Sequence, residues 1–246
     1  MRKWISGVLF SFGLVPLYAQ TQTVNQQVWL EYMGNYPFAN SFNFENAVAY
    51  NTVLNSSGWK DYSYSGTLEW SITQSVEPIA QVLLDYTQQT ATSNTFEVRP
   101  VIGCRFYFTS ARRIQTRLLV RFEDRNFKDI ETGVWTQAFR PRVRAEALIP
   151  ITQDSYFKDK LLYGILDVEA IFTTNDVKER FANRLRLRTG IGYRFSYSLR
   201  LEFIYMYQQS RDGIDEDFSS SDNIFRFRVK QYFRKSKPST ASGTGN

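Results

Sequence analysis

Hydrophobic and polar side chains alternate along most of the chain, from about residue 28 to residue 233. The stretch 184–194 is typical, because apolar residues stand at 185, 187, 191 and 193 while arginines stand at 184, 186, 188 and 194. Successive side chains of a β-strand point to opposite faces, whereas a helix would scatter both sets around its axis. The pattern therefore predicts an all-β protein whose strands each carry one apolar and one polar face.

Eleven such segments follow one another at intervals of about 20 residues. They begin near Val28, Phe42, Tyr62, Ile79, Phe96, Arg113, Trp135, Leu161, Phe181, Leu199 and Asn223. Several exceed the ~9–11 residues that a tilted membrane strand needs. Short links at 109–112 and 195–198 contrast with long polar links at 124–134 and 210–222. This rhythm is typical of an outer-membrane barrel with tight periplasmic turns and longer external loops.

Alternation alone does not say which face is buried, because a soluble sandwich alternates too. Three features favour the membrane. They are a secretory leader, aromatic residues near segment ends, and a series of strands without helices whose closure into a barrel would leave no exposed edge. The aromatic residues are Tyr62, Tyr86, Phe96, Phe108, Phe122, Phe172, Phe181, Tyr205, Tyr207 and Phe233. We expect a transmembrane antiparallel up-and-down β-barrel of 10–12 strands. Twelve is favoured because single-chain bacterial barrels use even numbers, and the first hairpin, near residues 28–48, is the least certain region.

The first nineteen residues predict a signal peptide. Arg2 and Lys3 precede a short apolar stretch at 8–17, and Ala19 closes the segment. The barrel is expected over residues 20–233. Residues 234–246 are basic and rich in Ser, Pro and Gly, which predicts a flexible C-terminal tail. The expected localisation is the cell outer membrane, reached by export.

Composition narrows the chemistry. The 246 residues include 30 Lys and Arg, 24 Asp and Glu, no His and one Cys. The lack of His excludes a Ser-His-Asp catalytic triad and any metal site with a His ligand. The single Cys excludes a disulfide framework. Neighbouring acids such as Glu123 with Asp124, or Asp215 to Asp217, resemble ordinary loop acids more than a catalytic pair. We expect no enzyme activity, no metal, no cofactor and no nucleic-acid partner.

Four stretches carry a family resemblance. They are WLEYMGNYPFANSFNFENAV from Trp29, FEVRPVIGCRFYFT from Phe96, SYFKDKLLYGILDVEAIF from Ser155 and NRLRLRTGIGYRFSYSLRLEFIY from Asn183. Together they resemble an uncharacterised outer-membrane-type β-barrel family of gram-negative bacteria, catalogued as a domain of unknown function. The resemblance covers most of the chain and implies the barrel. It implies no catalytic or binding residue.

If the apolar face meets lipid, the polar face lines the lumen. The arginines expected there are Arg99, Arg105, Arg117, Arg121, Arg140, Arg142, Arg144, Arg184, Arg186, Arg188, Arg194, Arg200, Arg226 and Arg228. Arginines two residues apart on one strand point the same way, about 7 Å apart. Such ladders need acids on neighbouring strands, and Glu169 and Glu202 are candidates.

Two interpretations of this lumen stay open. It is a structural salt-bridge network that fills the barrel, or it is a narrow passive channel for small anionic solutes, in which guanidinium groups pass a ligand along. An alternative is an outer-membrane enzyme or a surface binding protein that acts on lipid or lipopolysaccharide. The expected partners are outer-membrane lipid and lipopolysaccharide, and the sequence does not identify any protein partners.

Overall fold

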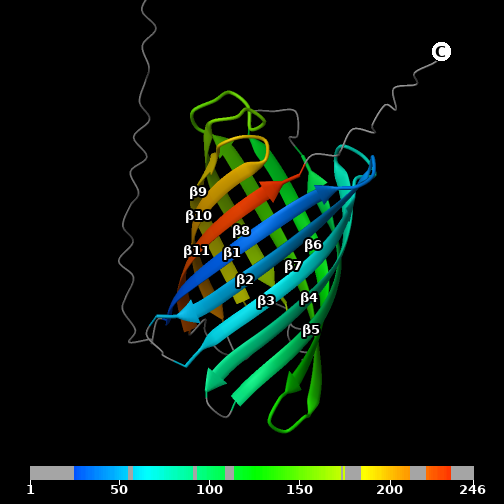
Figure 1. Cartoon of the computed structure of the whole chain (residues 1–246), viewed down its shortest axis with the longest axis vertical. Coiled ribbons are helices and arrows are strands. Elements are labelled where there is room, and N and C mark those ends of the chain that lie inside the picture. The colour runs from blue at the N-terminus through cyan, green and yellow to red at the C-terminus, as the bar shows by residue number, and fades with distance from the viewer. Residues whose placement is uncertain are drawn as a thin grey trace, which may run out of the picture.

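A computed structural model describes residues 25–54, 58–90, 93–108, 114–172, 174, 184–210 and 220–233. Eleven strands close into a single barrel, as Figure 1 shows. The strands are β1 (Asn25–Pro37), β2 (Phe42–Val53), β3 (Lys60–Trp70), β4 (Val76–Thr90), β5 (Ser93–Tyr107), β6 (Gln115–Asp129), β7 (Trp135–Pro150), β8 (Leu161–Ile171), β9 (Arg184–Arg194), β10 (Leu199–Ser210) and β11 (Ser220–Tyr232). Within these ranges no helix is long and apolar enough to cross a membrane. The predicted signal peptide and C-terminal tail lie outside the described residues.

Each strand pairs antiparallel with the next, and β1 closes the barrel by pairing parallel with β11. That last ladder runs from Asn25 opposite Asp222 to Asn35 opposite Tyr232. Eleven lies within the expected range of 10–12, but the favoured number of twelve is wrong for the described chain. Each of the eleven sequence segments corresponds to a strand. A parallel pair also satisfies the backbone hydrogen bonds, so an odd meander can close without an edge.

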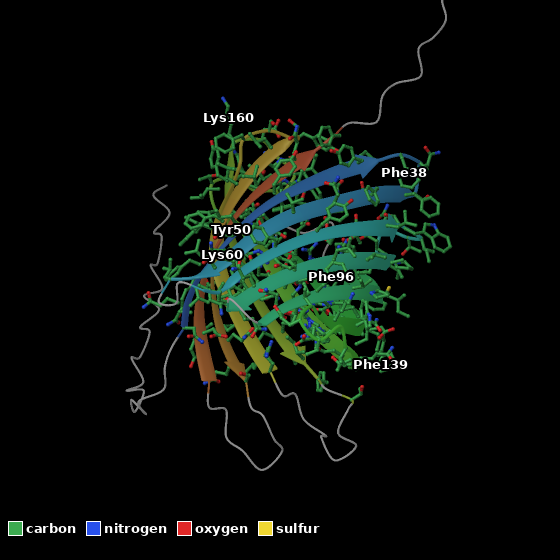
Figure 2. All side chains as sticks on the ribbon, turned by 60° about the horizontal axis from the view of Figure 1, so that its bottom comes forward. Phe38, Tyr50, Lys60, Phe96, Phe139 and Lys160 are labelled. Carbon is green, nitrogen blue, oxygen red and sulfur yellow. The ribbon has the colours of Figure 1, made fainter. Side chains whose placement is uncertain are left out.

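The odd count places the start of β1 and the end of β11 at opposite ends of the barrel. We call the end where β1 and β11 begin the N-end, and the end where they finish the C-end. Phe38, in the β1–β2 turn, and Lys160, just before β8, both lie at the C-end (Figure 2). The link expected over 124–134 is shorter than predicted, because β6 continues to Asp129 and β7 begins at Trp135.

Apolar side chains cover the outside of the barrel. Ile102 is 65% exposed, Phe122 56% and Leu201 42%. Neighbouring strands place aromatic rings side by side there, such as Phe203 with Phe227, whose ring centroids are 4.9 Å apart. An apolar surface this extensive exceeds what monomeric soluble proteins expose, so it marks an interaction surface rather than a solvated one.

A small apolar cluster fills part of the barrel interior near the C-end. It consists of Tyr156, Leu161, Tyr163, Ile165 and Ile204. Gly192 makes room for it, since a Cβ there would lie only 2.3 Å from Cζ of Tyr163. The cluster occupies the side of the barrel formed by β8, β9 and β10 near the C-end, so at this level the open space lies along the other strands.

Candidate functional site

The interior of the barrel holds one large polar cavity of about 820 Å³. Gln27 and Arg184 line it near the N-end, and Tyr107 and Tyr232 line it near the C-end. Every strand except β8 contributes to the lining. Spread over the ~25 Å height of a barrel's apolar band, this volume gives a mean cross-section of about 30 Å². The lumen is thus narrow but not filled by side chains.

Most of the arginines expected in the lumen line this cavity. They are Arg99, Arg105, Arg117, Arg121, Arg140, Arg142, Arg144, Arg184, Arg186, Arg188, Arg226 and Arg228. Arg200 instead lies under Tyr156 at the C-end, outside the cavity lining. Glu169 and Glu202 are buried among the basic side chains. The period of two therefore placed these side chains inside, because strand side chains alternate without drift.

Sequence reasoning missed five charged side chains that also line the cavity. They are Glu31, Asp61, Glu77, Arg125 and Asp222. Each lies in the first hairpin, near a strand end, or in a stretch taken for a loop. Extending the alternation of β6 by two residues, from Glu123 to Arg125, would have found the arginine. With these additions, fourteen cationic and ten anionic side chains line the cavity.

Glu169 is the hub of the basic side of the lumen. Its side chain is fully buried, and one oxygen lies 2.7 Å from Nη2 of Arg142. Nη2 of Arg188 lies 3.1 Å away, Nη1 of Arg186 3.5 Å and Nη2 of Arg121 3.6 Å. Four guanidinium groups from β6, β7 and β9 thus converge on one carboxylate of β8.

Two further carboxylates belong to the same cluster. Glu123 accepts from Arg140 and Arg142, with N–O distances of 2.5 and 2.8 Å, and forms an ion pair with Nε of Arg121 at 3.2 Å. Asp167 lies 2.5 Å from Nε of Arg188. The central arginine cluster is defined here as Arg121, Arg140, Arg142, Arg144, Arg186 and Arg188 with Glu123, Asp167 and Glu169. It contains six cations and three anions.

Arg144 is the least engaged member of this cluster. Among the described residues no carboxylate lies within ion-pair distance of its guanidinium group, and its buried Nε has no hydrogen-bond partner. The buried Nε of Arg121 makes no hydrogen bond either, and it reaches Glu123 only as an ion pair at 3.2 Å. The cluster therefore keeps unused donors despite its dense pairing.

Smaller ion-pair groups lie toward the two ends. Toward the N-end, Arg99 and Arg125 both form two-point contacts with Glu97 at 2.6–2.8 Å. Toward the C-end, Arg105 bridges Glu69 and Glu77.

The remaining pairs of the C-end half join β10, β11 and β1. Glu202 binds Lys230 at 2.9 Å and Arg228 at 3.2 Å, and it also accepts from Tyr163 at 2.7 Å. Glu31 pairs with both Arg226 and Arg228. These contacts hold long side chains against the wall, which keeps them from collapsing into the cavity.

The wall formed by β2, β3 and β4 is different in charge and size. Its charged cavity residues are all acidic: Glu45, Asp61, Glu69, Glu77 and Asp85. Between them stand small residues, Ala47 and Ala49 on β2 and Ser63 and Ser65 on β3. In an eleven-strand barrel β2 and β3 lie five strands away from β7 and β8, which places this wall opposite the central arginine cluster.

The loop at 151–160 caps one side of the C-end. Tyr156 folds into the barrel, where its hydroxyl accepts from Nη1 of Arg200 at 2.7 Å and its backbone oxygen accepts from Nη1 of Arg194 at 3.1 Å. Asp159 adds an ion pair with Arg194 at 3.3 Å. Burial raises the pKa of the Tyr156 phenol, so the hydroxyl stays protonated over the physiological range. This cap covers the apolar cluster, and the cavity passes beside it.

Comparison with known proteins bears on the family. The model of the family described as "Protein of unknown function (DUF2490)" matches residues 26–219. The chain belongs to this family. The match agrees with the resemblance to uncharacterised outer-membrane-type barrels. No curated protein matches the chain.

Among solved structures, the chain is similar to the siderophore receptor PirA from Pseudomonas aeruginosa, with 12% identity and a TM-score of 0.31. The match covers 71% of this chain and 33% of that receptor, so the chain spans about a third of its length. A likeness this slight transfers no property of the receptor.

The structure also locates the acids that were weighed as a catalytic pair in this DUF2490 member. Glu123 faces the lumen, whereas Asp124 accepts from Gln137 at 2.8 Å on the outside. Adjacent residues of a strand point to opposite faces, so the two carboxylates do not form a shared site. Asp215, Glu216 and Asp217 lie outside the described residues. In the described part of the chain, no group of His, Cys, Asp and Glu is arranged to hold a metal ion.

Proposed function

We propose that this barrel spans the outer membrane and that its lumen is a narrow passive channel for small anionic solutes. The observation that carries the proposal is the polar cavity itself. It is lined from near one end of the strands to near the other by fourteen cationic and ten anionic side chains. Asp167, Glu169 and Glu202 pair with lining cations from just behind the lining, which leaves one net positive charge.

The exterior supports the membrane part of the proposal. Large apolar side chains such as Ile102, Ile191 and Leu201 stand exposed around the barrel. In water this surface would be costly to hydrate, whereas acyl chains would cover it at no such cost. The turns at 38–41, 71–75 and 195–198 at the C-end are short, as is usual at the periplasmic side, whereas the loop at 151–160 is the longer connection at that end. Outer-membrane lipid and lipopolysaccharide are the partners implied.

The charge of the lumen supports the anion preference. Guanidinium groups stay charged at every physiological pH and present several N–H donors, so they attract carboxylate and phosphate groups. Salt bridges hold most of these groups at the wall, where they shape the field without blocking the path. A purely structural network remains the second candidate, favoured by the dense pairing around Glu169, but it would not require an unfilled cavity of about 820 Å³.

Planar-bilayer recording tests the proposal. We expect a small conductance. In a KCl gradient, the reversal potential should be shifted toward the equilibrium potential of chloride. Arg186→Gln should shift that potential toward potassium, because it removes one lumen charge while Glu169 keeps three other arginines. Absence of conductance, or cation preference in the unmodified protein, would contradict the channel.

The enzyme alternative has its own check. Purified barrel incubated with labelled lipopolysaccharide and phospholipid should release no product. Product formation that Arg186→Gln leaves intact would place the function on the surface instead of in the lumen.

A further inference from the structure

We propose that the central arginine cluster is a binding site for a small multivalent oxyanion of the phosphate class. This inference deepens the proposed channel, since it assumes that solutes reach the lumen, and it names what the lumen holds. It rests on the charge balance, the unused donors and the space in front of the cluster.

The charge balance leaves three positive charges uncompensated. Six arginines share Glu123, Asp167 and Glu169, and both Glu169 and Glu123 are almost completely buried. Partly buried like charges repel one another strongly because little water screens them. A bound anion of two or more charges would offset this repulsion more fully than chloride would.

The unused donors point the same way. Buried donors without partners are rare in proteins, and each needs an explanation such as a bound water or ion. Here the buried Nε of Arg144 has no hydrogen-bond partner, and no carboxylate within the described residues pairs with Arg144. The buried Nε of Arg121 makes no hydrogen bond either and has only an ion-pair contact with Glu123 at 3.2 Å. Both arginines lie beside Glu169, one on β6 and one on β7.

The geometry favours a tetrahedral ligand over a planar one. The arginines belong to β6, β7 and β9, so their N–H groups approach the lumen from different directions around the wall. The oxygens of a phosphate group accept hydrogen bonds from several directions, and arginine guanidinium groups bind phosphate bidentately. A single planar carboxylate accepts mainly in its own plane.

Space for the ligand exists opposite the cluster. Ala47, Ala49, Ser63 and Ser65 line the same cavity on β2 and β3, where larger residues would fill it. The two serine hydroxyls are donors that suit an oxyanion. Asp85 stands beside Ser63 in the β3–β4 register, whereas Ala47, Ser65 and Leu83 form a level of that wall without a carboxylate.

The test is phosphate binding to the full-length barrel in detergent, followed by calorimetry and by thermal unfolding at constant ionic strength. We expect saturable binding of sodium phosphate with a rise in Tm that sodium chloride does not give. Arg144→Gln should weaken phosphate binding at least tenfold. Its Tm without phosphate should not fall, because the change relieves repulsion in the cluster.

Arg125→Gln is the matched control. It also removes one lumen arginine, but from a pair in which Glu97 keeps Arg99. We expect it to change phosphate affinity less than twofold. Equal losses in the two variants would mean that only the overall field matters, and would overturn the site.

Other outcomes separate the inference from the channel. Phosphate binding without any conductance would support the site and overturn the channel. Conductance without saturable phosphate binding would support the channel and overturn the site. Tighter binding of succinate or citrate than of phosphate would overturn the assignment to the phosphate class.

Discussion

Replacing Glu169 with glutamine should destabilise the barrel by about 3–5 kcal/mol, the usual cost of removing one partner from a buried ion pair. Glu169 is fully buried and meets four guanidinium groups, of which Arg142 is nearest at 2.7 Å. Glutamine has nearly the same shape, so it creates no cavity. The loss comes from leaving the cluster with six arginines and two carboxylates.

Urea unfolding from lipid vesicles or detergent measures this effect. Glu77→Gln is the control, because Arg105, the ion-pair partner of Glu77 among the described residues, also has Glu69. We expect Glu77→Gln to cost less than about 1 kcal/mol, as for weakly coupled pairs. If the two variants are equally stable, the Glu169 hub does not organise the lumen.

Leu201→Arg should cost about 2–4 kcal/mol when the barrel is folded into lipid, if the residue lies near the bilayer midplane. Leu201 is in β10, flanked outside by apolar neighbours, and its side chain is 42% exposed. An arginine there would put a charge among acyl chains. The penalty depends on lipid at the outer face and on nothing in the lumen.

Phe38→Arg gives the comparison, since Phe38 is 58% exposed but lies in the β1–β2 turn. At the membrane boundary the same change should cost about 0–1 kcal/mol. Unfolding free energies of both variants in vesicles decide the matter. Equal, small costs at the two positions would show that β10 does not face lipid.

Much of this fold could be predicted from the sequence, because an alternation of apolar and polar residues with a period of two fixes which face of a strand each side chain occupies. The parity of Arg184, Arg186 and Arg188 assigns all three to one face, and all three line the cavity. Eleven alternating segments likewise correspond to eleven strands. The general preference for even numbers misled the count, since nothing in local alternation reveals that β1 and β11 pair in parallel.

Other features could not be read from local pattern. Asp124, Arg125 and Asn126 are consecutive polar residues, so both faces of the chain are polar there. This pattern resembles a loop, yet these residues continue β6. The convergence of four arginines on Glu169 depends on the register of β6 through β9, which sequence spacing does not fix. Insertion of Tyr156 under the C-end depends on Gly192 leaving room for Tyr163, which is a contact between distant segments.

The arrangement also explains why so charged a lumen is tolerated. Most guanidinium groups have a carboxylate on an adjacent strand, as Arg188 has Asp167 and Arg117 has Glu146. Pairing across strands ties the wall together, while small residues on β2 and β3 keep the interior open. The excess of arginine therefore falls on one wall and is presented to the cavity.

The central claim is that apolar side chains face lipid while the arginine-bearing face lines the bore. Fluorescence quenching by brominated lipid tests it directly. A bimane label is placed by Ile102→Cys or, in the lumen, by Ser65→Cys, each with the native cysteine removed by Cys104→Ala. The label at position 102 should be strongly quenched in vesicles and the label at position 65 should not. Quenching at position 65, or equal accessibility of both labels to water, would contradict the claim.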